Sequence, residues 1–74
     1  MIQEAIEKVK SGESQVVLDF SSVLRIDADV VGAMEELAGL ADGKSVKVVL
    51  RAVNTDVYRV LKQLKLARQF TFVT

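Results

Sequence analysis

Apolar residues recur along this chain with two alternating periods, and this alternation constrains the fold more than any other feature. The first helical face is formed by Ile2, Ala5, Ile6 and Val9, which recur at the spacing of an amphipathic helix. The run Val16–Phe20 then has the length and composition of a buried strand. The same order occurs twice more, so the sequence predicts three helices and three strands in the order αβαβαβ.

The ends of these elements follow from capping residues. Asp27 is the expected N-cap of the second helix, and Asn54 begins a capping signal for the third. Gly12 and Gly43 are expected to end the first two helices, because glycine readily adopts the left-handed backbone that stops a helix. The predicted helices are residues 2–11, 28–41 and 55–65, and the predicted strands are Val16–Phe20, Val46–Leu50 and Phe70–Val73.

Helices that alternate with strands over short connections predict an α/β fold, with helices packed on a small parallel sheet. The strand at Val16–Phe20 is apolar on both faces, which is typical of a parallel sheet covered on both sides. A chain of 74 residues has room for one core, so residues 1–74 are expected to form a single domain. The predicted core comprises Leu18, Phe20, Met34, Leu37, Val49, Val60, Leu61 and Leu64.

The residue types present exclude several classes of chemistry. The sequence has no cysteine and no histidine, which excludes disulfides, Cys/His zinc sites and histidine-based triads. Its four glycines are scattered, so no phosphate-binding loop is predicted. Asp27 and Asp29 are the carboxylates placed for acid–base work or magnesium binding, but acids at a helix start are better explained by capping. We therefore expect no catalytic residue, no metal site and no cofactor.

The net charge of zero conceals two oppositely charged halves. Residues 1–43 carry nine acidic and three basic side chains, a net charge of −6, whereas residues 44–74 carry one acidic and seven basic, a net charge of +6. The halves can pair internally or present an acidic and a basic face to partners. The predicted third helix and the residues after it carry Arg59, Lys62, Lys65 and Arg68. With Tyr58 as the one aromatic beside them, we expect no nucleic-acid binding.

The sequence shows no recognisable membrane-spanning or secretion signal. No apolar stretch approaches the ~20 residues of a membrane helix, and the N-terminal residues do not resemble a signal peptide. The sequence therefore predicts a cytoplasmic protein without membrane insertion.

Three segments carry a pattern that extends beyond periodicity. They are Val16–Val23 (VVLDFSSV), Ile26–Gly32 (IDADVVG) and Val53–Leu61 (VNTDVYRVL). Together they resemble the STAS domain, and the resemblance covers the chain from about residue 2 to residue 73 with every element in family order. The family includes bacterial anti-sigma factor antagonists, stressosome components, and regulatory domains of anion transporters and of lipid-transporting ABC complexes.

The resemblance implies a regulatory position at the start of the second helix. The family motif usually reads Asp-Ser-Ser-Gly-x-Gly, and a partner kinase that is also the anti-sigma factor phosphorylates its second serine. Asp27 and Gly32 match this motif. Ala28 replaces the first serine, Asp29 the phosphoacceptor and Val30 the first glycine. Because a serine kinase cannot phosphorylate aspartate, the usual switch is expected to be absent, and Asp29 imitates a phosphoserine only in part.

The resemblance also implies the assembly and the function. Family members normally open with a β-hairpin, whereas this chain begins at the first helix, so an exposed sheet edge is expected to favour a homo-oligomer. We expect a non-enzymatic protein-interaction module of the anti-sigma factor antagonist kind; the alternatives are a regulatory subunit that docks on the ATPase of an ABC lipid transporter, and a small phosphate-binding enzyme. The expected partner-binding residues are Asp27, Ala28, Asp29, Val30, Asn54 and Thr55.

Overall fold

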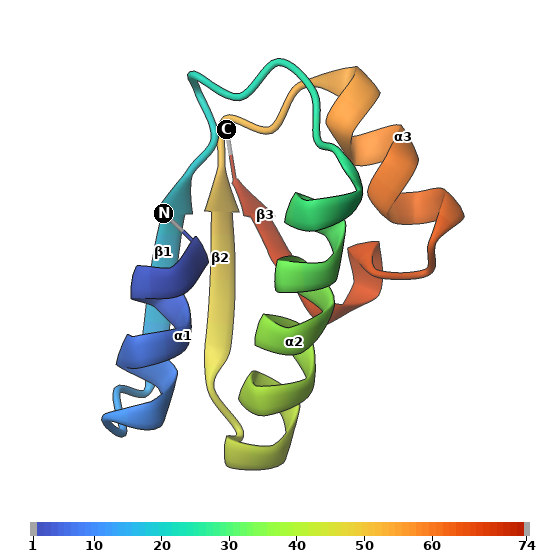
Figure 1. Cartoon of the computed structure of the whole chain (residues 1–74). Coiled ribbons are helices and arrows are strands. Elements are labelled where there is room, and N and C mark those ends of the chain that lie inside the picture. Colours follow the sequence, from blue (N-terminus) through green and yellow to red (C-terminus); the bar gives the residue numbers. More distant parts are fainter. Residues whose placement is uncertain (1, 74) are drawn as a thin grey trace.

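Three helices and a three-stranded parallel sheet form in the predicted order. The computed structural model describes residues 2–73 (Figure 1). Its elements are α1 (Ile2–Lys10), β1 (Gln15–Asp19), α2 (Ala28–Lys44), β2 (Lys47–Arg51), α3 (Thr55–Gln63), the 3-10 turn η1 (Ala67–Gln69) and β3 (Thr71–Val73). The predicted α/β class and αβαβαβ order are confirmed, and the strands lie within one residue of their predicted bounds.

The sheet has the order β1-β2-β3, with both pairs parallel. Val16 pairs with Val48 and Leu18 with Leu50, and Leu50 pairs in turn with Phe72. Paired residues of neighbouring strands point to the same face of a sheet, so these five side chains form one apolar face. The two crossovers run in the same direction across the sheet, and right-handed crossovers of that kind place their helices on the same side.

All three helices pack on this one face (Figure 1). Helix α1 contributes Ile2, Ala5, Ile6 and Val9 to the core, and α2 contributes Met34, Leu37, Ala38 and Ala41. Val57 and Leu61 of α3 join the same cluster. Six of the eight predicted core residues are buried, namely Leu18, Phe20, Met34, Leu37, Val49 and Leu61.

The opposite face of the sheet is not covered by any of residues 2–73, so the prediction of a sheet covered on both sides is wrong. Val16 and Leu18 are buried, but Val17 between them is 46% exposed, and Val73 of β3 is also exposed. Val49, which pairs with Val17 and Thr71 on this face, is 7% exposed but does not belong to the core cluster. Val16 and Val17 point to opposite faces of the sheet. Two successive valines have the same sequence pattern whether or not a helix covers the second face, so the pattern could not predict that this face is bare.

Helix α2 is longer than predicted. It continues through Gly43 to Lys44 and ends at Ser45, whose backbone is left-handed (φ 57°) and whose N–H donates to the carbonyls of Ala41 and Asp42. Gly43 therefore lies inside the helix and does not stop it. Gly12, in contrast, has φ 93° just after α1, as expected of a glycine that ends a helix.

Helix α3 is shorter than predicted, and this changes its contribution to the core. The chain leaves the helix after Gln63 and turns at Lys65 (φ 63°), so that Leu64 is 46% exposed. Leu66 takes the inward position, and its N–H donates to the Leu61 carbonyl at 2.8 Å. The prediction of Leu64 as a core residue is therefore wrong, and Val60 is only half-buried.

Candidate protein-docking site

Two loops meet at the edge of the sheet where the strands end. The β1–α2 loop spans residues 20–27 and the β2–α3 loop spans residues 52–54, and the N-termini of α2 and α3 lie at the same end of the molecule (Figure 1). This is the edge at which open α/β sheets present their functional groups. We call the two loops and the first turns of α2 and α3 the docking edge.

Asn54 joins the two loops. Its Oδ1 accepts from the Val57 N–H at 2.8 Å and caps α3. Its Nδ2 donates to the carbonyls of Val23 at 3.1 Å and Leu24 at 3.0 Å, in the other loop. One half-buried amide therefore satisfies a helix N-terminus and two loop carbonyls at once, which fixes the β1–α2 loop against α3.

Asp27 and Asp29 occupy the start of α2, as predicted. The Asp27 Oδ1 accepts from the Val30 N–H at 2.9 Å, which confirms it as the N-cap. Asp29 lies in the first turn with its side chain exposed, next to exposed Ala28. The positive end of the helix dipole favours a carboxylate at this position. The Asp27 side chain is thus engaged in capping α2, whereas the Asp29 side chain faces solvent.

A hollow opens between the two loops, with a cavity volume of about 640 Å³. Its lining consists of Leu24, Arg25, Asn54, Thr55 and Asp56. It includes two of the predicted partner-binding residues, Asn54 and Thr55, but none of residues 27–30. The six predicted residues therefore flank one edge of the molecule but do not form one hollow.

Leu24 and Arg25 were not predicted as site residues. Leu24 is 76% exposed, the largest exposed fraction of any large apolar side chain within residues 2–73. Apolar residues in loops have no period, so nothing in the sequence distinguishes Leu24 from Val23 or Ile26, which are half-buried against the core.

Comparison with protein families identifies the fold family of this arrangement. The family model described as the STAS domain matches residues 1–74, the whole chain. This chain belongs to the STAS domain family. Neither the curated proteins nor the solved structures compared with the chain contain a significant match. STAS domains are typically non-enzymatic regulatory modules that act through protein–protein interaction, of the anti-sigma factor antagonist kind.

In this STAS domain the β1–α2 loop is braced where it leaves the sheet. The Asp19 Oδ1 accepts from the Ser21 N–H at 2.8 Å. Hydrogen bonds from the Ser21 backbone and side chain lower the pKa of Asp19 below its ordinary value, and the nearby Arg51 guanidinium contributes in the same direction. Asp19 and Arg51 are paired in register on β1 and β2, so the Ser21 turn and the Arg51 charge act on the same carboxylate at this end of the sheet.

The docking edge carries acidic, basic and apolar side chains. Within residues 2–73, no three acidic, histidine or cysteine side chains lie close enough together to hold a metal ion. Among the helices of the same residues, none combines the length and apolar character needed to cross a bilayer. The docking edge therefore presents an exposed leucine, charged side chains and two helix N-termini to the solvent.

Proposed function

We propose that this STAS domain is a non-enzymatic antagonist or scaffold that binds a regulatory partner protein of the anti-sigma type through the docking edge. The residues proposed to contact the partner are Asp27, Ala28, Asp29, Val30, Asn54 and Thr55. Asp29 holds the domain in one binding state, since it supplies a permanent negative charge at the position where the family's phosphoserine is expected.

The observation that carries this proposal is the place of Asp29. It is exposed in the first turn of a helix whose N-cap is satisfied by another residue, Asp27. Its carboxylate is therefore free to meet a partner. A carboxylate has one negative charge and two oxygens, whereas a phosphoserine has about −1.5 to −2 charge and three acceptor oxygens, so the imitation is partial.

The alternative partner is the ATPase of a bacterial ABC lipid transporter, for which this domain would be a regulatory subunit. The family contains both kinds of protein, and both roles use the same edge of the fold. Both partners act in the cytoplasm, which is where this proposal places the chain. The protein encoded beside this gene distinguishes the two roles: it is a kinase-like anti-sigma factor in the first and a permease or ATPase in the second.

Calorimetric titration against that neighbouring protein tests the proposal. The wild-type chain is compared with Asp29→Ser and with Glu36→Ser, an exposed acid farther along α2 that serves as the matched control. We expect Asp29→Ser to change the affinity about tenfold or more, or ~1.4 kcal/mol, and Glu36→Ser to leave it unchanged. A cognate serine kinase, where one is present, is expected to phosphorylate Ser at position 29 of the variant.

Two results would contradict the proposal. Equal affinities of wild type and Asp29→Ser would mean that Asp29 only stabilises the start of α2, where serine replaces an acid at a small cost in stability. Turnover of a substrate or binding of a nucleotide by the isolated chain would instead favour the phosphate-binding enzyme.

A further inference from the structure

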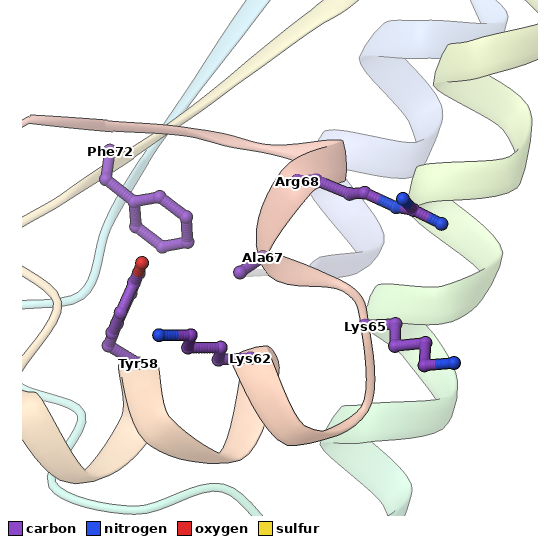
Figure 2. A pocket seen from close by; sticks show the side chains of 6 residues that line it. All are labelled: Tyr58, Lys62, Lys65, Ala67, Arg68 and Phe72. Carbon is purple, nitrogen blue, oxygen red and sulfur yellow. The ribbon is translucent and has the colours of Figure 1, made fainter.

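A second hollow lies between α3, η1 and β3, and it shares no lining residue with the hollow at the docking edge. Its cavity volume is about 490 Å³, within the range of sites that hold small molecules. The lining residues are Tyr58, Lys62, Lys65, Ala67, Arg68 and Phe72 (Figure 2). Every charged side chain in this lining is a cation, and the others are aromatic or apolar.

Two aromatic side chains form one wall of this hollow. Tyr58 projects from α3 toward Phe72 of β3, with ring centroids 5.0 Å apart and an edge-to-face angle of 82° (Figure 2). The Ala67 methyl group of η1 points into the space beside them (Figure 2). Lys62 extends from α3 with its ammonium group toward Tyr58, whereas Lys65 and Arg68 point away from the aromatic pair (Figure 2).

The aromatic pair also borders an adjacent hollow of about 570 Å³. That hollow is lined by Ala52, Val53, Thr55, Tyr58, Phe72 and Val73, and it has no charged residue. Tyr58 and Phe72 line both hollows, so the two adjoin at the aromatic pair beside the edge strand β3. We call the two adjoining hollows the groove. The groove is cationic at the end near Lys62 and uncharged at the end near Val53.

We propose that this groove binds an amphipathic anion, an apolar chain that carries a single carboxylate or phosphate. The apolar chain lies in the uncharged half, against Val53 and Val73, and passes the aromatic pair. The anionic head meets the Lys62 ammonium group in a charge-assisted contact, and Lys65 and Arg68 add to the positive potential near it. The division of the groove into a charged and an uncharged half selects an amphiphile over a simple ion.

Lysine near the end of α3 has a second physical explanation, because cations offset the negative end of a helix dipole. That effect explains a charge at position 62 but not an aromatic wall with an uncharged hollow beside it. The two explanations differ in one measurable respect: the dipole requires no ligand, whereas the groove discriminates among amphiphiles of equal length and different head groups.

Tyr58 makes the test direct, because it is the only tyrosine in a chain without tryptophan. Its emission therefore reports on this groove alone. The probes are sodium decanoate, decyl phosphate, decanol and decyltrimethylammonium, each below its micelle-forming concentration. We expect saturable changes in Tyr58 emission with decanoate or decyl phosphate, at least tenfold weaker binding of decanol, and no saturable change with the cation. Comparison of the two anions identifies the preferred head group.

Three variants locate the site. Lys62→Gln is expected to weaken decanoate binding at least fivefold. Lys44→Gln at the end of α2 is the matched control, because it also removes one exposed lysine, and it is expected to leave decanoate binding unchanged. Ala67→Leu fills the hollow and is expected to weaken all probes that bind. Far-UV circular dichroism of each variant establishes that it is folded, and Lys62 is exposed, so its substitution leaves the core intact.

The proposal is overturned by any of three results. These are no saturable change with either anion, equal affinity for decanoate and decanol, or equal effects of Lys62→Gln and Lys44→Gln on decanoate binding. The uncharged half of the groove shares Ala52, Val53 and Thr55 with the docking edge. The two proposals still fail separately, because these results concern amphiphile binding by the chain alone, whereas the proposed function is tested by Asp29→Ser against the partner protein.

Discussion

Asn54 makes three hydrogen bonds with one side chain, and these bonds determine how the two loops of the docking edge lie together. An asparagine at a helix start is usually interpreted as a cap alone. Here the amide nitrogen also reaches carbonyls 30 and 31 positions away in the sequence. A residue predicted to contact a partner is therefore also a structural support of the surface that the partner would meet.

Two substitutions separate the roles of Asn54. Asn54→Ala removes the cap and both loop contacts, and we expect it to lower the free energy of unfolding by about 1–3 kcal/mol. Asn54→Asp keeps an oxygen for the Val57 N–H but cannot donate to the carbonyls of Val23 and Leu24. We expect it to lower the free energy of unfolding by about 1 kcal/mol. Urea unfolding measures both, with exposed Thr55→Ala as control. An Asn54→Asp variant as stable as wild type would show that the loop contacts contribute nothing.

Asp19 gives the domain a predictable response to acid. Its pKa is lowered in the folded state, so the folded state binds fewer protons than the unfolded chain at low pH. The resulting stabilisation is fully present above the ordinary value of 3.8 and is lost as the pH falls through the lower, folded-state pKa. We expect the stability difference between wild type and Asp19→Asn to be largest near neutral pH and to shrink on acidification. A difference that stays constant with pH would contradict the lowered pKa.

At the scale of single elements, α3 is the clearest case of a boundary that controls packing. Leu61 is fully buried, whereas Leu64, one turn later, is about half exposed because the helix ends at Gln63. Leu66 then enters the core from the turn that follows. The position of one helix end therefore decides which of two leucines contributes to the core.

A matched pair of leucine truncations tests this boundary. Leu61→Ala is expected to lower the free energy of unfolding by ~2–5 kcal/mol, because it leaves a cavity in the core. Leu64→Ala removes the same atoms from an exposed position, so its cost is expected to stay below ~1 kcal/mol. Thermal or urea unfolding of both proteins measures the difference. Similar losses for the two variants would mean that the helix continues through Leu64.

For the whole molecule, the important feature is that every helix lies on one side of the sheet. The accessible surface is 4865 Å², whereas the scaling rule gives about 4,500 Å² for a chain of this mass. Parallel sheets are seldom left bare on one face, and this one exposes Val17 and Val73 there. A second copy brings an identical bare face, so the two faces can cover each other in a symmetric pair.

Sedimentation equilibrium at micromolar concentration tests this expectation of self-association. The wild-type chain is expected to exceed 8.1 kDa in apparent mass. Val17→Lys places a charge on the bare face and is expected to shift the protein toward the monomer, because burial of an unpaired charge is costly. Leu24→Lys, at an exposed apolar position on the docking edge, is the control and is expected to leave the mass unchanged. A folded wild-type monomer would contradict the expectation.

The sequence by itself determined the order of elements, the α/β class, the capping roles of Asp27 and Asn54, and the family. Each of these depends on residues close together in the chain, where periodicity, capping chemistry and motif spacing act directly. Only the tertiary structure decided which face of β1 is buried, which of Leu64 and Leu66 enters the core, and that Tyr58 meets Phe72. These outcomes depend on the direction of the crossovers and the end of α3, and such long-range packing leaves no local signal in a single sequence.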